Sequence, residues 1–475
     1  MRSFVVIWIG QVVSILGSAM TGFAVTIWVY EGTEKATALA LTAFFFTTPL
    51  LLLSPLAGVL VDRYNRKLMM IISDLASGLT TIAVLILHST GNLEVWHLFV
   101  TNAISGSFQT LQWPAYSAAI SLMLPKEQYA RANGMLELAG SGSRVFAPML
   151  AGALLIPLGL TGILIIDVVT FSFAIGALLW VKIPQPTVSA EGRTGQGSMI
   201  EEAIFGFRYI LERPSLLGLQ TVFMLGNFFV TVPFVIFAAM ILARTGNDEM
   251  ALGSVLSAGA IGGIAGGLAM TAWGGPRRRI HGVLAGWALT GVLGIMLVGV
   301  GRSLPVWIVG SFFGNLINPL INGSNQAIWQ SKVAPDVQGR VFSTRRLIAW
   351  LVTPIATLMA GPLADSVLEP GMASTGGLVR LFGWLTGTGP GSGMALLFVA
   401  GGAVASMIAL GAYAVPAVRG VETILPDHGS GEITPTAGVE IRWTRRHRVA
   451  VAMGALVLVA LIVGLGWLQV VALSS

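Results

Sequence analysis

The strongest constraint on the fold of this chain is a series of thirteen apolar runs, each long enough to cross a lipid bilayer. A helix needs about 20 apolar residues to span a hydrocarbon core of roughly 30 Å. Lipid offers no hydrogen bonds to the backbone, so runs of this length must form helices. We therefore expect an all-α, multi-pass membrane protein with spans near 4–29, 38–61, 68–88, 96–123, 133–156, 160–182, 215–242, 251–273, 281–300, 304–333, 347–365, 391–415 and 449–472.

A polar stretch at residues 183–214 separates the first six runs from the next six. Residues of the same type recur between the two sets at a constant offset of 209 positions, which indicates a duplicated six-helix unit. The predicted organisation is an N-terminal half (1–182), a linker (183–214), a C-terminal half (215–415), a tail (416–448) and an additional transmembrane helix (449–475). The matching pairs are Gln11 and Gln220, Gly17 and Gly226, Gly58 and Gly267, Arg131 and Arg340, and Gly152 and Gly361.

The distribution of basic residues predicts the orientation. With the N-terminus inside, 22 Lys and Arg residues fall in cytoplasmic segments and four in outer segments. The positive-inside rule then places the N-terminus, the linker and the tail in the cytoplasm. An odd number of spans places the C-terminus outside a plasma membrane. Because topology accounts for the net charge of +6, binding to nucleic acid is not predicted.

Enzyme and metal chemistry find little support in the residues. The chain has no cysteine, and its five histidines include no pair at metal-ligand spacing. No nucleophile, base and acid are grouped in a polar segment. We therefore predict no metal site, no cofactor and no enzymatic activity.

Polar side chains recur within several spans at helical spacing. Gln109 belongs to a polar row on run 96–123, whereas Asn318 and Asn322 belong to a similar row on run 304–333. Gln11 lies within the first run. These four residues are candidates for lining a path through the protein, and the alternative is that they form hydrogen bonds between helices.

Charged side chains inside the membrane are the second kind of candidate. Arg144 is expected to face a cavity or an acid, since an arginine at mid-span costs about 2.5 to 3.5 kcal/mol on insertion scales. Asp167 matches its depth, and Asp74 is the second choice as its partner. A buried carboxylate can also bind and release a proton. The candidates for that role, in order of preference, are Glu137, Asp167, Asp74 and Glu31, with a fixed ion pair as the alternative.

The most specific motif is GVLVDRYNRK, from Gly58 to Lys67, between the second and third runs. It matches the pattern G-x-L-x-D-R-x-x-R-K/R and resembles the major facilitator superfamily. The segments at 10–31, 54–74 and 326–365 are similar to the branch that contains bacterial macrolide efflux proteins and the enterobactin exporter. The resemblance covers residues 1 to about 415 and implies a twelve-helix bundle of two six-helix halves.

The resemblance also implies a cytoplasmic gate. Gly58 would allow close approach to the eleventh helix, which is the expected span 347–365. Asp62 would cap a helix N-terminus in the second half. The basic members of the motif are Arg63, Arg66 and Lys67. The second copy keeps Gly267 but is followed by AMTAWGGPRRR, which contains no acid. A single strong gate contact is therefore expected. Exporters of this superfamily tend to show the pattern G-x-x-x-G-P-x-x-G-G in the fifth helix, here the expected span 133–156. This chain matches it only at Pro148 and Gly152.

The implied function is secondary active transport by alternating access, with proton-coupled efflux of drug-like or amphipathic small molecules. In addition to substrate, protons and membrane lipids are the expected partners. One alternative is a transporter of lipids or lysophospholipids. Another is a non-transporting membrane subunit that anchors a larger complex through a protein partner at helix 449–472 and the outer loop 366–390.

Overall fold

A computed structural model describes residues 1–33, 36–186, 197–373 and 377–428. All regular secondary structure in these ranges is helical, which confirms the expected all-α class. In the same ranges, eight helices are long and apolar enough to cross a membrane, and one bent pair would make nine. The additional helix at 449–472 and most of the tail lie outside the described residues.

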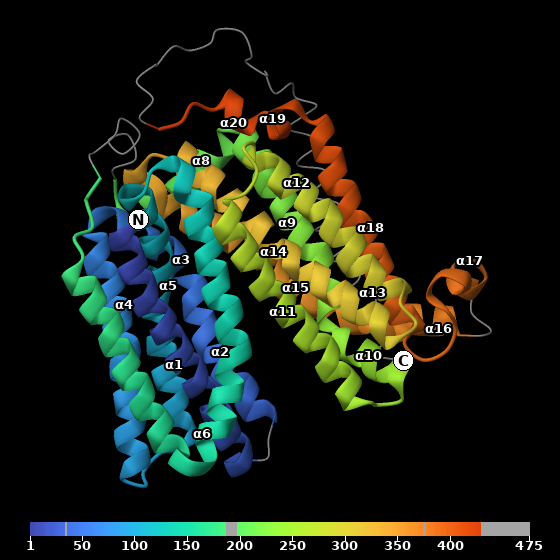
Figure 1. The fold of residues 1–475 in the computed structure, drawn as a ribbon, viewed down its shortest axis with the longest axis horizontal. Coiled ribbons are helices and arrows are strands. Elements are labelled where there is room, and N and C mark those ends of the chain that lie inside the picture. The colour runs from blue at the N-terminus through green and yellow to red at the C-terminus, as the bar shows by residue number, and fades with distance from the viewer. Residues whose placement is uncertain (34–35, 187–196, 374–376, 429–475) are drawn as a thin grey trace.

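The helices of the first half lie side by side and run between the two ends of the molecule (Figure 1). Its second span bends by 53° between α2 and α3. Two expected spans, 133–156 and 160–182, are joined in one 52-residue element that turns at Gly159, where the backbone φ of 65° suits glycine. The helices are α1 (Arg2–Thr33), α2 (Ala36–Leu52), α3 (Ser54–Arg63), α4 (Arg66–Ser89), α5 (Val95–Met123) and α6 (Tyr129–Trp180).

The second half repeats this plan with more interruptions. Two π-helical segments, η2 (Thr290–Met296) and η4 (Leu363–Leu368), break its spans. Its helices are α9 (Pro214–Val235), α10 (Phe237–Thr245), α11 (Glu249–Trp273), α12 (Arg279–Leu289), α13 (Leu297–Val300), α14 (Leu304–Lys332), α15 (Gln338–Pro362) and α18 (Ser392–Ala414).

Two expected loops contain helices. The linker forms the amphipathic helix α8 (Met199–Leu211), which begins with a capping box between Ser198 and Glu201. The glycine-rich loop 366–390 contains α16 (Glu369–Met372) and α17 (Gly377–Thr386). The described part of the tail contains α19 (Pro416–Arg419) and α20 (Val421–Ile424). Short amphipathic stretches of this kind do not reach the length that identifies a span.

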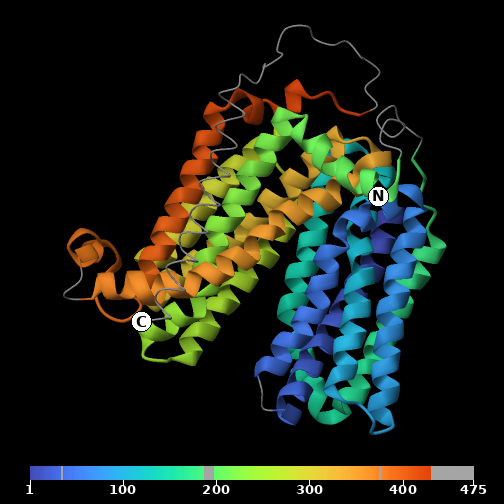
Figure 2. The same ribbon diagram turned by 180° about the vertical axis from the view of Figure 1, so that it is seen from behind.

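The two halves meet at one end of the molecule and diverge toward the other (Figures 1 and 2). The end at which they meet carries the N-terminus, α8, α19 and α20, and we call it the closed end. The opposite end, which carries the turn within α6 and the short helix α17, is called the open end. This arrangement determines where the halves can exchange side-chain contacts.

Apolar burial holds together the helices within each half. One cluster of buried residues lies wholly in the first half and contains Ile163, and another lies wholly in the second half and contains Phe237. The cluster that contains Ile120 also includes Met270 of the second half. Large apolar side chains such as Ile156 and Trp180 are instead 92 % and 88 % exposed. Exposed apolar surface of this extent suits contact with lipid.

Candidate functional site

The backbones of the two halves come into contact where α3 crosses α15 at the closed end. Gly58 on α3 faces Gly339 on α15, and a Cβ atom at Gly58 would lie 2.5 Å from the carbonyl oxygen of Gly339. The reverse also holds, because a Cβ at Gly339 would lie 2.5 Å from the carbonyl oxygen of Gly58. Two glycines thus allow backbone contact between the halves.

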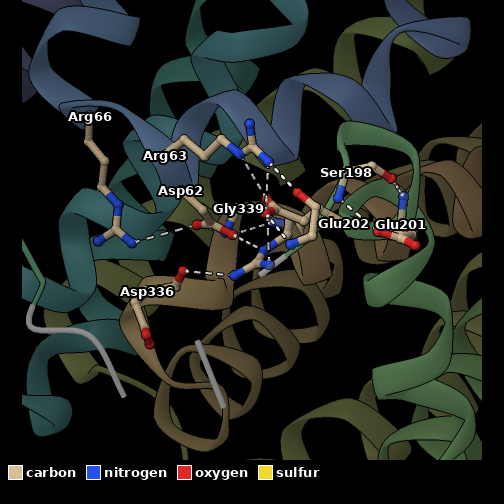
Figure 3. A network of polar contacts seen from close by, with 10 residues as sticks. Asp62, Arg63, Arg66, Ser198, Glu201, Glu202, Asp336 and Gly339 are labelled. Carbon is tan, nitrogen blue, oxygen red and sulfur yellow. Dashed lines mark hydrogen bonds and ion pairs between the residues drawn. The ribbon is translucent and has the colours of Figure 1, made fainter. Parts of the chain in front are cut away.

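Asp62 lies one helical turn beyond Gly58 and caps the start of α15 (Figure 3). Its carboxylate accepts hydrogen bonds from the backbone N–H groups of Gly339 at 2.7 Å and Arg340 at 2.9 Å. The Arg340 side chain adds a further bond at 3.2 Å. A carboxylate at a helix N-terminus is worth about 0.3 to 1 kcal/mol, and up to about 2 kcal/mol when partly buried. The Asp62 side chain is only 2 % exposed.

The remaining basic residues of the motif hold the surrounding backbone. Arg66 is fully buried, lies 3.8 Å from Asp62, and donates to the carbonyl oxygens of Ala118 and Pro335. Lys67 donates to the carbonyl oxygens of Leu179 and Val181, both at 2.9 Å, at the end of α6. Arg66 therefore bridges the two halves, whereas Lys67 binds within the first half.

Arg63 connects the motif to the linker helix α8. Its guanidinium binds both carboxylate oxygens of Glu202, at 2.9 and 3.1 Å, and the carbonyl oxygen of Gly197 at 2.8 Å (Figure 3). Burial tends to raise the pKa of Glu202. However, its hydrogen bonds with Arg63 and Gly197 and its charge contact with Arg340 bring that pKa below the usual 4.5. Glu202 is thus held as a carboxylate between the two halves.

The tail adds a separate contact across the closed end. The Asp427 carboxylate lies 2.9 Å from Lys332, at the end of α14, and 3.4 Å from Lys126, just before α6. Burial tends to raise the pKa of Asp427, but the two lysines lower it below 3.8 overall. One tail residue therefore binds a cation of each half.

One contact between the halves joins residues at the offset of the predicted duplication. Ser117 and Gln326 are separated by the same 209 positions and form a hydrogen bond with each other. Equivalent residues touch only where they lie near a two-fold axis, so this bond marks the axis relating the halves. On the opposite side of the axis, the Arg131 side chain donates to the carbonyl oxygen of Ala272 at 3.1 Å. A backbone carbonyl thus meets Arg131, whereas the Asp62 carboxylate meets Arg340.

A cavity of about 1200 Å³ lies between the halves. Its lining extends from Val29, Thr42 and Leu98, toward the open end, to Gln112 and Gln326. Both polar and aromatic side chains contribute, so the lining suits a molecule with polar and apolar parts. Among the candidates for lining a path, Gln11, Gln109 and Asn322 line this cavity.

Asn318, the fourth of these candidates, does not line this cavity. Its side-chain oxygen accepts a hydrogen bond from Asn322 at 2.5 Å. Helical spacing groups Asn318 and Asn322 on one face of α14 but does not distinguish the cavity side of that face. Glu31, in the last turn of α1, is likewise outside the lining.

Two of the acidic candidates are held by neutral partners. Asp74 accepts hydrogen bonds from Gln11 at 2.8 Å and from Gln112 at 3.0 Å. Asp167 accepts from Ser18 at 2.9 Å and from Thr81 at 3.1 Å. Both line the cavity, and neither forms an ion pair with another described residue.

The expected pairing of Arg144 with Asp167 is therefore not observed. Glu137, also in α6, is the acid nearest to the charge of Arg144, and its carboxylate lies near the Asn322 side chain. Depth along the membrane normal matched Arg144 to Asp167, but helix packing directs Asp167 toward α1 and α4. Glu137, Arg144 and Asn322 all line the cavity, the first two from the first half and Asn322 from the second.

Four residues of the site were missed by the sequence. Glu202 and Asp427 lie in segments expected to be a linker and a tail, and no local pattern identifies their partners. Arg345 and Arg346 fall just before the predicted span 347–365 and were counted among the cytoplasmic basic residues. The structure places both in α15, lining the cavity. The adjacent arginines followed by Trp350 were the available signal. No cluster suited to a metal ion occurs in the described ranges.

A helical membrane bundle with two related halves around a central polar cavity defines the class of a membrane transporter. The model of the Major Facilitator Superfamily matches residues 7–357, and the chain belongs to this family. This membership and the fold confirm the expected family, the bundle of two six-helix halves and a multi-pass membrane protein that is a transporter and not an enzyme.

Similar proteins with known names include exporters. The chain is 27 % identical to macrolide efflux protein A of Streptococcus pyogenes over 370 residues, which are 77 % of this chain and 90 % of that protein. It is 25 % identical to the multidrug efflux pump Tap of Mycolicibacterium fortuitum over 377 residues, covering 75 % and 90 %. The fold also matches a bacterial homologue of the iron transporter ferroportin in an outward-facing state. The TM-score is 0.63, the identity 17 %, and the coverage 86 % of this chain and 99 % of that one.

Proposed function

We infer that this chain is a secondary active exporter of amphipathic small molecules that works by alternating access and is coupled to protons. The observation that carries this proposal is the cavity between the halves, which is lined by both polar and aromatic side chains and bounded at one end by the Asp62 contacts. The efflux proteins named above support the export direction.

The orientation follows from the basic residues. The closed end carries the N-terminus and Arg63, Arg66, Lys67 and Lys126, and the positive-inside rule places such an end in the cytoplasm. The described conformation is then outward-facing. The Asp62 contacts, the Arg63–Glu202 pair and the Asp427 contacts together form the cytoplasmic gate of this proposal. They must break for the cavity to open to the cytoplasm.

Proton coupling is assigned to the carboxylates of the cavity, with Glu137 as the first choice. Glu137 lies near Arg144 of its own half and near Asn322 of the other half. Because its surroundings include both halves, they change when the halves rock against each other. An acid whose environment differs between two conformations binds its proton differently in each, which is the requirement for coupling.

The experiment is transport in proteoliposomes under an imposed pH gradient. A panel of three amphipathic dyes, one anionic, one neutral and one cationic, is loaded, and its movement is followed with and without the gradient. We expect at least one dye to move faster than in protein-free liposomes and to respond to the gradient. No protein-dependent movement of any dye would overturn the transport proposal. Movement that ignores the gradient would overturn the coupling.

A further inference from the structure

Arg345 and Arg346 are adjacent residues of α15 that line the cavity and take no part in the cytoplasmic gate. Arg345 is 9 % exposed. One of its terminal nitrogens donates to the side-chain oxygen of Gln326, whereas the other is buried and has no hydrogen-bond partner among the described residues. A buried donor without an acceptor is costly and calls for an explanation.

Aromatic rings surround the two guanidinium groups. The Arg345 guanidinium lies 5.3 Å from the ring centre of Trp329 and 5.6 Å from those of Trp113 and Phe342. Arg346 lies 5.2 Å from Trp113 and 4.9 Å from the ring of Trp350. Such contacts stabilise a cation through the ring faces but accept no conventional hydrogen bond from its N–H groups. Apart from the Arg345 nitrogen that donates to Gln326, the N–H groups of both guanidinium groups therefore keep their donor capacity.

The acids of the cavity do not neutralise these arginines. Asp74 is bound by Gln11 and Gln112, and Asp167 is bound by Ser18 and Thr81. Glu137 lies near Arg144. Arg345 and Arg346 form no ion pair with any described residue. Two adjacent cations, one of them buried and neither in an ion pair with a described residue, favour an anionic occupant.

We propose that Arg345 and Arg346 form a binding site for the anionic group of the transported molecule. Carboxylate, sulfonate and phosphate groups match the donor geometry of guanidinium. Trp113 and Trp350 would contact the apolar body of the same molecule, so the substrate class is an amphipathic organic anion. This assignment rests on the proposed function, because it takes the cavity as the transport pathway.

The test compares two probes that share an aromatic body and differ in charge. Anilinonaphthalene sulfonate carries a sulfonate, and phenylnaphthylamine has the same rings without it. Binding to the full-length protein in nanodiscs of neutral lipid is measured by energy transfer from tryptophan, with empty nanodiscs as the background. We expect Arg346→Gln to weaken sulfonate binding by at least about tenfold, because a charge-assisted contact is lost. Binding of the neutral probe should stay unchanged.

Two further variants keep this test decisive. Arg346 is the first choice since it is only partly buried, and Arg345→Gln is examined only if it elutes as a single folded species. Arg208→Gln, on the exposed side of α8 beside Glu212, removes the same charge outside the cavity and should leave both probes unaffected. Equal sulfonate affinity in wild type and Arg346→Gln would overturn the proposal, and so would an equal loss in Arg208→Gln.

The anion can come from solution or from a lipid headgroup, and the same assay distinguishes these sources. Displacement of the sulfonate probe by nanodiscs containing phosphatidylglycerol would assign the site to a lipid anion. Unchanged binding would assign it to a solute.

Failure of the proposed function would give a different result from failure of the anion site. If the chain is not a transporter, arginine-dependent binding would persist while no dye is transported in proteoliposomes. Conversely, transport of the cationic dye without arginine-dependent binding would overturn the anion site alone.

Discussion

Asp62 and Gly339 lie 277 positions apart and are joined by a hydrogen bond of 2.7 Å from the Gly339 backbone to the Asp62 carboxylate. The bond links the end of α3 to the first turn of α15, and it forms where Gly58 and Gly339 bring the two backbones together. Helix capping and close packing thus occur at one point, so a single motif both brings the halves together and holds them.

Replacing Asp62 by Asn should weaken the closed state. The amide keeps the shape but loses the charge that two backbone N–H groups and Arg340 bind, at a cost of roughly 2 kcal/mol, or about thirtyfold in the closed-to-open ratio. Spin labels at Tyr64→Cys and Arg277→Cys, in a chain without native cysteine, would report longer distances across the closed end. Asp365→Asn is the matched control, because Asp365 is exposed. An unchanged distance distribution would remove Asp62 from the gate.

The pair of Arg63 and Glu202 can be tested by exchanging its charges. Arg63→Glu and Glu202→Arg should each place like charges side by side and open the closed end, as read from the same spin labels. The double variant should recover part of the closed population, since it restores an ion pair in the opposite sense, whereas the contact of Glu202 with Arg340 stays lost. If Arg63→Glu alone leaves the distances unchanged, the contact contributes nothing to the gate.

A side chain at Gly58 should separate α3 from α15. The first side-chain carbon of Gly58→Val would lie 2.5 Å from the Gly339 carbonyl oxygen and 2.9 Å from the Arg340 Cα, which forces the backbones apart. We expect a loss of about 1 to 3 kcal/mol from the closed state and a drop in turnover. Gly176→Ala, in α6, is the control, since no atom lies within 4 Å of its added carbon. Normal turnover in Gly58→Val would contradict the close crossing.

Acid should weaken the closed end through Glu202. Its pKa is lowered below 4.5 when its contacts with Arg63, Gly197 and Arg340 are formed, so the closed state binds fewer protons than the open state. Its contribution is complete above the ordinary pKa and is lost as the pH falls through the lowered pKa. The spin-label distances should lengthen as the pH falls below the ordinary value of 4.5. Glu202→Gln should be more open at neutral pH and change less over this range. An identical response in both proteins would exclude Glu202 as a contributor.

Replacing Glu137 by Gln should uncouple transport from protons. The amide keeps the contact with Asn322 but cannot release a proton, so transport should lose its response to an imposed pH gradient while binding of the probes persists. Glu212→Gln, on the exposed end of α8, is the matched control and should behave as wild type. If Glu137→Gln still follows the gradient, the coupling acid is another residue of the cavity, and Asp167→Asn and Asp74→Asn are the next variants to measure.

The sequence by itself determined the helical class, most spans, the duplicated unit and the motif that contains Asp62. These features are local: apolar length and residue spacing reflect what the bilayer demands of each segment. The close approach of Gly58 to the eleventh expected span, which is α15 in the structure, also followed from the motif, because the resemblance specifies that contact.

Only the tertiary structure decided which polar side chains meet. Equal depth in the membrane predicted that Arg144 pairs with Asp167. In the packed bundle, Asp167 instead accepts hydrogen bonds from Ser18 and Thr81. Hydropathy placed Arg345 and Arg346 outside a span, because two charged residues lower the average hydropathy of a segment. That average does not register the cavity that accommodates their charge. Glu202 and Asp427 acquire partners only when distant segments cross the closed end. Contacts of this kind depend on how helices pack against one another, which one-dimensional periodicity does not specify.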